Sequence, residues 1–404
     1  MKKTKSMLYL GVDVPLLLVV MALLAFGLLM VYSAGWEFSV TQLGEEPGYL
    51  LGRQVGFVVL GVFLAIFIFF FGYHRLRKFV VPLFIITIAL LLMVVFFMGE
   101  TRLGARRTLF QGSIQPSEFA KLAVVVYLAY WLDAKKESLS DLSFGLYPLI
   151  LLLGLASGLI MAQPDISAAA TVIMMGGIMF FLGGGEMRQI LMVLLIAILV
   201  GSIIVYFVPT GRERLTTFIA GIRDPQYAHY QVKRSIEAIV RGGFFGVGIG
   251  RATTKFTGLP VAPTDSIYAV IAEETGVIGA GLLVILFIVF LWRGLHIANQ
   301  AVDHLGKLVA AGITVWIFLE AVINMSVMVN LMPIAGNALP LISAGGSSMI
   351  TILAGIGLLM SVARASAKEK NKEEGRPLHE IVNLRGDDGR RNLSRSRRSA
   401  SFGR

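Results

Sequence analysis

The chain has 404 residues, of which 56% are hydrophobic and 15% are charged. Soluble globular domains contain about 45–50% apolar and roughly 25% charged residues, so this composition excludes an ordinary soluble domain. Lysine and arginine number 36 against 25 acidic residues, and much of that excess lies at the two ends of the chain. Such placement favours anionic lipid headgroups over nucleic acid as the partner. The absence of cysteine excludes disulfides, thiolate nucleophiles and cysteine-based metal sites.

Long apolar runs recur along the chain, and crossing about 30 Å of hydrocarbon needs roughly 20 residues. In lipid, an isolated apolar segment satisfies its backbone only as a helix, so the sequence predicts an all-α polytopic membrane protein. The run after MKKTK is too long for a cleavable signal peptide, and we expect it to be retained. We predict ten transmembrane helices, at residues 13–33, 52–71, 79–98, 118–132, 145–162, 167–184, 187–208, 267–292, 307–329 and 341–363.

The lysines and arginines outside the spans predict the orientation, because cytoplasmic loops are enriched in them. Basic residues occur at the amino terminus, after the second span, after the fourth span and beyond Arg364. With an even number of spans these segments share one side, so both termini are predicted to be cytoplasmic. Residues 1–365 form the predicted transmembrane domain. Residues 366–404 are basic and poor in apolar residues, and we expect a disordered cytoplasmic tail.

Two connections that this topology places outside the membrane are rich in basic residues. One covers residues 99–117, and the other is a large loop at 209–266 between the seventh and eighth spans. Basic residues on that side oppose the usual charge bias, and an anionic substrate would account for them. Guanidinium groups suit bidentate contact with phosphate. The candidate substrate-binding cations are Arg106, Arg107, Arg214, Lys233 and Arg234.

Four polar segments map to the predicted outer face. They are GARRTLFQGSIQPSEFAK (104–121), AQPDIS (162–167), LPVAPTDSIYAVIAEETG (259–276) and MPIAGNALPLISAGGSS (332–348). In the third, Asp265 directly precedes the eighth span. Aspartate is a favoured helix N-cap, so a capping role stands beside a role as general base.

Two further segments carry charged side chains at span boundaries. Glu118 and Lys121 lie three residues apart and share a helix face, which fits either a local ion pair or a functional site. Asp165 precedes the sixth span, where it is either an N-cap or a salt-bridge partner of Lys121. Pro116 and Ser117 suit a helix start.

Polar groups deeper in the spans have structural alternatives. Glu273 and Glu274 lie two turns into the eighth span, where pairing with a lysine or arginine competes with a functional role. Glu320 and Asn324 share a face of the ninth span and are expected to join helices. RGGFFGVGIG (241–250) follows no strand, so it does not predict a phosphate loop, and its surroundings suit the membrane interface. LPLISAGGSS resembles a broken entry into the last span.

As a set, GARR with QPSEFAK, QPD, the glycine-rich run before LPVAPTD, AEE and LPLISAGGSS resemble the SEDS family (shape, elongation, division and sporulation), which includes FtsW and RodA. The resemblance runs from about residue 12 to residue 365, with the motifs in order. Each motif alone is weak, whereas the set is specific. GIGRATTKFTGLP lacks the longer insertion typical of RodA-like members, which favours FtsW or its sporulation relative.

The resemblance implies a peptidoglycan glycosyltransferase that polymerises lipid II at the outer face of the bacterial cytoplasmic membrane during cell division. The implied partners are a class B penicillin-binding protein and other membrane proteins of the divisome or elongasome. The resemblance implies no built-in cofactor and leaves open whether a divalent cation (Mg²⁺ or Mn²⁺) assists. The family's essential acid maps to Asp265, and its important basic residues map to Arg107 and Lys121, with Glu118 beside them; the QPD acid maps to Asp165.

The chain departs from the family pattern at three points. Ser266 stands where the family usually has an aromatic residue, Val261 where it usually has an acid, and LPLISAGG where LPFISYGG is usual. These changes affect partner or acceptor detail more than the reaction, because the ionisable groups remain. A lipid II flippase is the main rival function, although transporters often contain repeated halves and none is visible here. A non-catalytic scaffold that recruits the transpeptidase is the third alternative.

Overall fold

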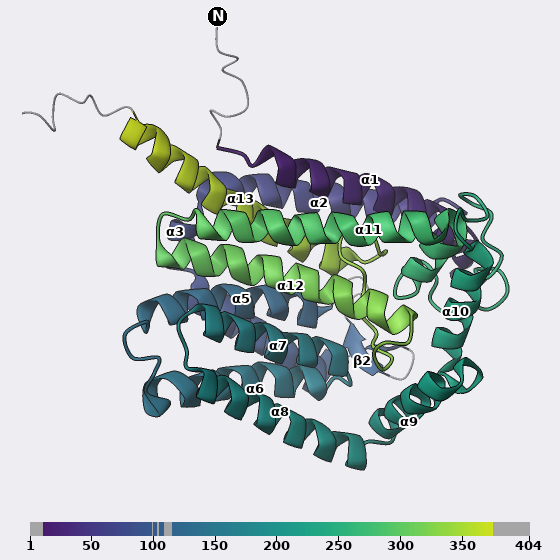
Figure 1. The fold of residues 1–404 in the computed structure, drawn as a ribbon, viewed down its shortest axis with the longest axis horizontal. Coiled ribbons are helices and arrows are strands. Elements are labelled where there is room, and N and C mark those ends of the chain that lie inside the picture. The colour runs from purple at the N-terminus through teal and green to yellow at the C-terminus, as the bar shows by residue number, and fades with distance from the viewer. Residues whose placement is uncertain (1–10, 99, 103–104, 109–114, 375–404) are drawn as a thin grey trace, which may run out of the picture.

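The computed structural model describes residues 11–98, 100–102, 105–108 and 115–374. Long helices lie side by side along one direction, as Figure 1 shows. Each of the ten predicted spans overlaps one of these helices. They are α1 (Val14–Glu37), α2 (Tyr49–Phe71), α4 (Val80–Met93), α5 (Pro116–Ala134), α6 (Tyr147–Met161), α7 (Ile166–Leu182), α8 (Met187–Phe207), α11 (Ile267–Asn299), α12 (His304–Met328) and α13 (Gly346–Glu374).

Shorter elements connect the long helices. Two of them, α9 and α10, lie together at the end of the bundle that is distant from α3 (Figure 1). A two-stranded antiparallel hairpin, in which Thr101 pairs with Arg106, adds a small β element to the predicted all-α fold. The short helices are α3 (Tyr73–Leu76), α9 (Pro209–Arg223), η5 (Pro225–Tyr227) and α10 (Tyr230–Gly242), the strands are β1 (Glu100–Arg102) and β2 (Ala105–Thr108), and the π-helical turns are η2 (Phe38–Gln42), η3 (Val94–Met98) and η4 (Leu142–Leu146).

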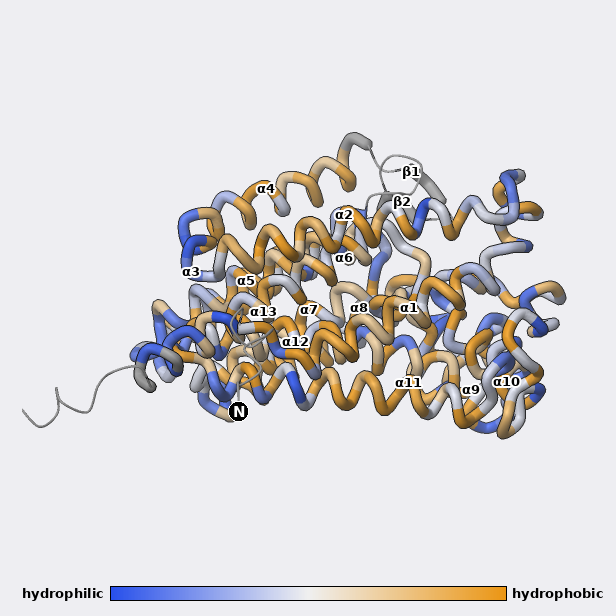
Figure 2. The backbone as a smooth tube through the Cα atoms, turned by 90° about the horizontal axis from the view of Figure 1, so that it is seen from above, coloured by the Kyte–Doolittle hydropathy of each residue, from blue (hydrophilic) through white to orange (hydrophobic). Residues whose placement is uncertain are grey.

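Six helical segments of the described chain are long and apolar enough to cross a membrane, and three more apolar helices are shorter. The six comprise α1 with its π-helical end, α2, α6 with its π-helical start, α11, α12 and α13; the shorter ones are α4, α7 and α8. Figure 2 shows apolar residues along these helices and hydrophilic residues mainly near the bundle ends. The chain is therefore a multi-pass membrane protein, as predicted.

The centre of the bundle is built around α12 and α13, which are mostly buried, whereas α2 is mostly exposed. α12 packs against α5, α7, α11 and α13, and α2 covers α13. The outer faces of α2, α4 and α8 carry exposed large apolar side chains such as Phe63, Ile85 and Leu195. This distribution suits a lipid environment, since lipid tails solvate apolar surface that water would not.

The last span differs from its predicted bounds at both ends. The helix begins at Gly346 instead of residue 341, because residues 339–345 form a loop in which Leu341 has a φ of 64°. The predicted broken entry into this span is thus confirmed. The helix continues to Glu374, past the predicted start of the tail at 366. Residues 375–404 lie outside the described residues.

α11 also differs from a simple span because it is interrupted at Gly276, where φ is 69° and ψ is −173°. The interruption leaves four backbone groups without their usual partners, and the glycine-rich segment 243–248 supplies all four. Val277 N donates to Gly243 O (2.9 Å) and Ile278 N to Phe244 O (3.3 Å). In return, Val247 N and Gly248 N donate to the carbonyls of Glu273 and Glu274, each at 3.0 Å. A broken helix is tolerated at membrane depth only when its backbone groups are satisfied in this way.

Candidate functional site

Asp265 lies in the turn that leads into α11. Ser266 occupies the N-cap position of this helix and its side chain makes no capping bond, so the interpretation of Asp265 as the N-cap is wrong. Ser266 Oγ instead donates to Pro260 O (2.8 Å) and accepts a bond from Gln231 Nε2 (2.8 Å). The side chain of Asp265 is therefore not the N-cap of α11.

The backbone of the Asp265 turn is fixed by two distant segments. Asn324 Nδ2 on α12 donates to Asp265 O at 2.9 Å and to Asn337 O at 2.6 Å. Ser343 Oγ donates to Thr264 O at 2.6 Å, and Ala344 N donates to Pro263 O at 2.9 Å. Three consecutive carbonyls of the turn thus have donors, which restrains the position of the Asp265 side chain.

The 339–345 loop is itself held by Gln54 of α2, which is 3% exposed. Gln54 Nε2 donates to Ser343 O, and Gly345 N donates to Gln54 Oε1, both at 3.1 Å. At the start of α13, Ser347 Oγ accepts a bond from Gln115 N at 3.2 Å. The loop and the first turn of α13 therefore connect the Asp265 turn with the segment that opens α5. An isolated glutamine inside an apolar span was the available sequence signal for Gln54, but its partner could not be identified from the sequence.

Lys121 is buried in a three-member charge cluster, at 2% exposure. Its Nζ donates to Glu118 Oε1 at 2.8 Å, which is the local ion pair that the spacing predicted. It also donates to Glu320 Oε1 of α12. Glu320 therefore joins two helices, as expected, but the sequence did not identify Lys121 as its partner. The second oxygen of Glu118, Oε2, is buried and has no hydrogen-bond partner among the described residues.

Asp165 is the N-cap of α7, where its Oδ1 accepts a bond from Ala168 N at 3.2 Å. Its Oδ2 accepts bonds from Gln115 Nε2 (2.9 Å) and Ser117 Oγ (3.2 Å). The capping interpretation is thus confirmed. The alternative salt bridge with Lys121 does not occur, because the lysine binds Glu118 and Glu320 instead. Asp165 ties the QPD turn to the start of α5.

The candidate basic residues lie in three different elements. Arg106 and Arg107 belong to β2, where the structure describes the backbone and not the side chains. Arg214 is half-buried on α9, and Lys233 is half-buried on α10 and makes no ion pair within the described residues. Arg234 contacts Glu237 one turn away and the carbonyl of Thr257. Lys233 is thus the α10 cation better placed to meet an external anion.

The two glutamates of AEE have different partners. Glu274 Oε1 accepts bonds from Lys255 Nζ (2.8 Å) and Ser33 Oγ (2.6 Å), which confirms the predicted pairing with a lysine. Glu273 accepts bonds from the backbone amides and hydroxyls of Thr253 and Thr254, including Thr253 N at 3.0 Å. Both carboxylates thereby hold the 250–255 segment against α11.

The four predicted motif segments converge at one end of the bundle, through the hydrogen bonds described above. At this end, hydrogen bonds fix the backbone of the Asp265 turn, and neighbouring helices carry further acidic and basic side chains. Within the described part of the chain, no three histidine, aspartate or glutamate side chains form a cluster suited to a metal ion.

At the edge of this region, burial lowers the pKa of His229, whose ring accepts a bond from Gln231 N (3.3 Å) and caps α10.

Comparison with known proteins identifies the family. The chain is 35% identical over 354 residues to a probable peptidoglycan glycosyltransferase FtsW of Trichlorobacter lovleyi, covering 87% of this chain and 93% of the relative. It is 34% identical to the stage V sporulation protein E of Bacillus subtilis, covering 88% of this chain and 97% of that protein.

Solved structures agree with the sequence matches. The rod shape determining protein RodA of Thermus thermophilus superposes with a TM-score of 0.64 at 27% identity, covering 88% of this chain and 98% of RodA. A chain of a peptidoglycan synthase complex, described for its coordination of polymerization and crosslinking, gives a TM-score of 0.71 at 28% identity with the same coverage. The family model for the FtsW, RodA and SpoVE cell cycle proteins matches residues 14–368. The chain belongs to this family.

Proposed function

We propose that this chain is a peptidoglycan glycosyltransferase that polymerises lipid II at the outer face of the bacterial cytoplasmic membrane, in cell division. The observation that carries the proposal is the convergence of the Asp265 turn, the Glu118–Lys121 helix start and the QPD turn at one end of a membrane-embedded bundle. The names of the FtsW relatives support the same reaction.

In the proposed reaction, a sugar hydroxyl of the acceptor attacks the anomeric carbon of the donor. A new glycosidic C–O bond forms as the bond to the polyprenyl pyrophosphate breaks. Asp265 takes the hydroxyl proton as general base, and the electron pair of the broken bond leaves with the pyrophosphate. Preorganised cations stabilise the charge that develops there. In our proposal these cations include Arg106, Arg107, Arg214 and Lys233.

Lys121 has a different role in this proposal from the one that the family resemblance implies. Its ammonium group already donates to two carboxylates, and at 2% exposure it is screened from direct contact with an external pyrophosphate. We therefore assign Lys121, Glu118 and Glu320 to holding α5 against α12. Asp165 and Arg234 also act by positioning segments, since their polar atoms bind neighbouring parts of the chain.

The proposed topology has ten membrane crossings. They are the six long helices, the three shorter apolar helices, and α5, which belongs to neither group because it contains several charged side chains. Both termini then lie in the cytoplasm, and residues 209–266, with α9 and α10, lie outside. Residues 1–365 form the glycosyltransferase domain, and the basic tail follows it. This arrangement places all candidate residues on the side where lipid II would be polymerised.

The proposed partner is a class B penicillin-binding protein, supported by the similarity to a chain from a peptidoglycan synthase complex. Other divisome or elongasome membrane proteins are expected around this pair. A divalent cation, Mg²⁺ or Mn²⁺, stays part of the proposal as an ion that would reach the site with the substrate's pyrophosphate oxygens. Such an ion would offset phosphate charge in the same way as the arginines do.

The test compares two activities of the purified protein with its transpeptidase partner. In detergent with lipid II, the proposal predicts glycan strands that gel electrophoresis resolves as a ladder. In vesicles with labelled lipid II, it predicts no translocation beyond protein-free vesicles. Translocation without glycan would transfer the function to a flippase. Neither activity, from a complex that still binds its partner, would favour a scaffold.

A further inference from the structure

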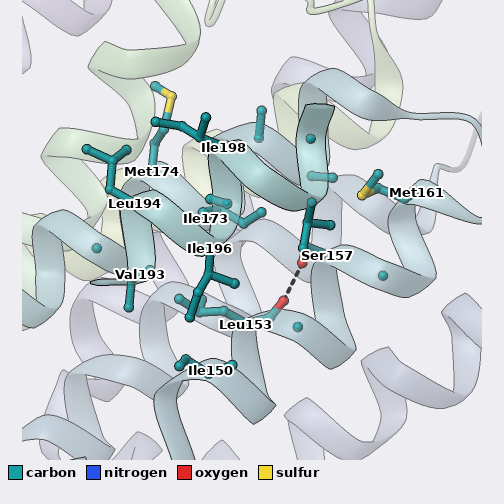
Figure 3. Close-up of a pocket in the computed structure, with 18 of the residues that line it drawn as sticks. Ile150, Leu153, Ser157, Met161, Ile173, Met174, Val193, Leu194, Ile196 and Ile198 are labelled. Atoms are coloured by element: carbon teal, nitrogen blue, oxygen red, sulfur yellow. Dashed lines mark hydrogen bonds between the residues drawn. The ribbon is translucent and has the colours of Figure 1, made fainter. Parts of the chain in front are cut away.

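A cavity of about 620 Å³ lies between α6, α7 and α8 (Figure 3). Its volume falls within the range of about 300–1,000 Å³ that is usual for ligand pockets. On α6 the lining extends from Ile150 to Met161, which is about 16 Å of helix at a rise of 1.5 Å per residue. The cavity thus extends over roughly half of a hydrocarbon core of about 30 Å.

The cavity surface is apolar. Ser157 is the one polar side chain among the described lining residues, and its Oγ donates to Leu153 O of its own helix at 2.5 Å (Figure 3). Four glycines widen the space, because a Cβ built on any of them meets no atom within 4 Å: Gly154, Gly158, Gly177 and Gly201. Such a cavity gives a polar ligand no partner, whereas it accommodates a methyl-branched hydrocarbon.

One end of the cavity adjoins the candidate site. Met161 and Ile166 both line it, and they flank the QPD turn. In that turn, Asp165 accepts bonds from Gln115 and Ser117, which open the helix that carries Glu118 and Lys121. A chain that filled the cavity would therefore emerge beside the region where the proposed reaction takes place.

A cation lies further along the same path. A second cavity, of about 460 Å³, shares Ile198 and Gly201 with the first and is also lined by Tyr206 and Arg212. Arg212 is exposed and makes no ion pair within the described residues. The apolar space thus continues towards a guanidinium group, which is a favoured partner of phosphate oxygens.

The cavity also borders the bilayer. Ile196 and Ile198 of α8 line it and are 44% and 58% exposed. α8 packs mainly against α7 and α9, at the edge of the bundle in Figure 1. A hydrocarbon chain could therefore enter from the membrane beside α8 without passing through water.

We propose that the cavity between α6, α7 and α8 binds the polyprenyl chain of the lipid-linked substrate, with Arg212 near its pyrophosphate. The inference rests on the proposed function and adds a chain-binding site to it. A phospholipid acyl chain has similar chemistry. The continuity of the cavity with the QPD turn and with Arg212 favours the lipid whose head group the proposed reaction uses.

The test fills the cavity with side chains. In the double variant Gly158→Leu/Gly177→Leu, the leucines occupy open space, and leucine is a better helix former than glycine, so the helices should remain stable. Gly56→Leu on α2 is the matched control, because its Cβ also meets no atom within 4 Å and it lies outside the cavity. Lipid II with a full-length polyprenyl chain is compared with an analogue whose chain is only a few isoprene units long.

The wild type and Gly56→Leu should show a lower KM for the long-chain substrate. In the double variant, the KM for that substrate should rise by about three- to tenfold, the scale expected when packing is lost without exposure to water. The KM for the short-chain analogue should stay unchanged. An undiminished preference for the long chain in the double variant would overturn the proposal.

A binding assay separates this proposal from the proposed function, because it needs no polymerisation. Polyprenyl phosphate with a diazirine in its chain should crosslink to peptides within 150–178 or 190–201 of the wild type, and not of the double variant. Unlabelled polyprenyl phosphate should compete, and phosphatidylglycerol should not. Crosslinks elsewhere, or equal competition by phosphatidylglycerol, would overturn the chain site. Crosslinking without glycan synthesis would contradict only the proposed function.

Discussion

Lys121 carries its charge into the interior of the bundle, where two carboxylates surround it. A buried ammonium group is tolerated when it is paired, and removal of one member of such a cluster leaves an uncompensated charge. The cluster contains one cation and two formal anions. Loss of the lysine therefore disturbs the charge balance of the cluster more than loss of either glutamate. Glu118, at the outer edge of the cluster, is the member nearest to solvent, with 11% of its side chain exposed.

Lys121→Met should therefore destabilise the fold by about 3–5 kcal/mol, because Glu118 and Glu320 would face each other without a cation. Thermal unfolding in detergent, followed by tryptophan fluorescence, measures this loss. The double variant Lys121→Met/Glu320→Leu should recover part of it, since the more deeply buried charge is also removed. Wild-type stability of Lys121→Met would show that the cluster does not join α5 to α12.

At the scale of single elements, the interruption of α11 is the clearest case of structure set by a distant segment. The four backbone groups released around Gly276 are those that segment 243–248 binds. Close approach explains the glycines there. A Cβ on Gly246 would lie 2.2 Å from Glu274 O, and the residue has a φ of 78°, which side chains disfavour.

Gly246→Ala should destabilise the protein more than Gly250→Ala does. Both positions have positive φ, so alanine at either should cost about 1–2 kcal/mol. Only at Gly246 does the added carbon also meet the backbone, since a Cβ on Gly250 has nothing within 4 Å. The difference in midpoint temperature between the two variants isolates the docking of the segment on α11. Equal midpoints would contradict that docking.

The sequence predicted the helices and the broken entry into the last span, but not the interruption of α11. Ten apolar runs predicted ten helices because each run identifies itself locally through its length and polarity. The insertion of 243–248 into α11 depends on a contact between segments about thirty residues apart, which no local pattern records. The same holds for Gln54 and Ser343, whose partners lie in other helices. At Asp265, the local N-cap preference was misleading because the helix begins one residue later.

At the scale of the whole molecule, the motifs meet at one end of the bundle, which agrees with their predicted common face. Gln115 bonds to Asp165 and to Ser347, and Ser343 bonds to Thr264. The side of the membrane on which this end lies follows from the charge bias of the loops. Chemical labelling can test directly on which side of the membrane this end lies.

Single cysteines at Thr210 and Lys136 of this cysteine-free chain should label differently. Both positions are exposed, one on α9 and the other in the turn after α5. In whole cells, a membrane-impermeant maleimide should label Thr210→Cys, and Lys136→Cys should react only after permeabilisation. The reverse pattern would place the motif end in the cytoplasm and exclude polymerisation on the outer face.

The central claim is that Asp265 removes a proton during glycan polymerisation. Asparagine has nearly the same volume, and the N-cap of α11 and the bond from Asn324 to the Asp265 carbonyl involve other groups. Asp224→Asn is a matched control, because Asp224 lies in the same loop and caps η5, a role that asparagine can keep.

The deciding measurement is the rate of glycan synthesis from purified lipid II by the wild type, Asp265→Asn and Asp224→Asn, each folded and bound to its partner. Loss of the general base should lower the rate by about 10²–10⁴-fold for Asp265→Asn, and Asp224→Asn should match the wild type. A wild-type rate from folded Asp265→Asn would contradict the assignment of the base.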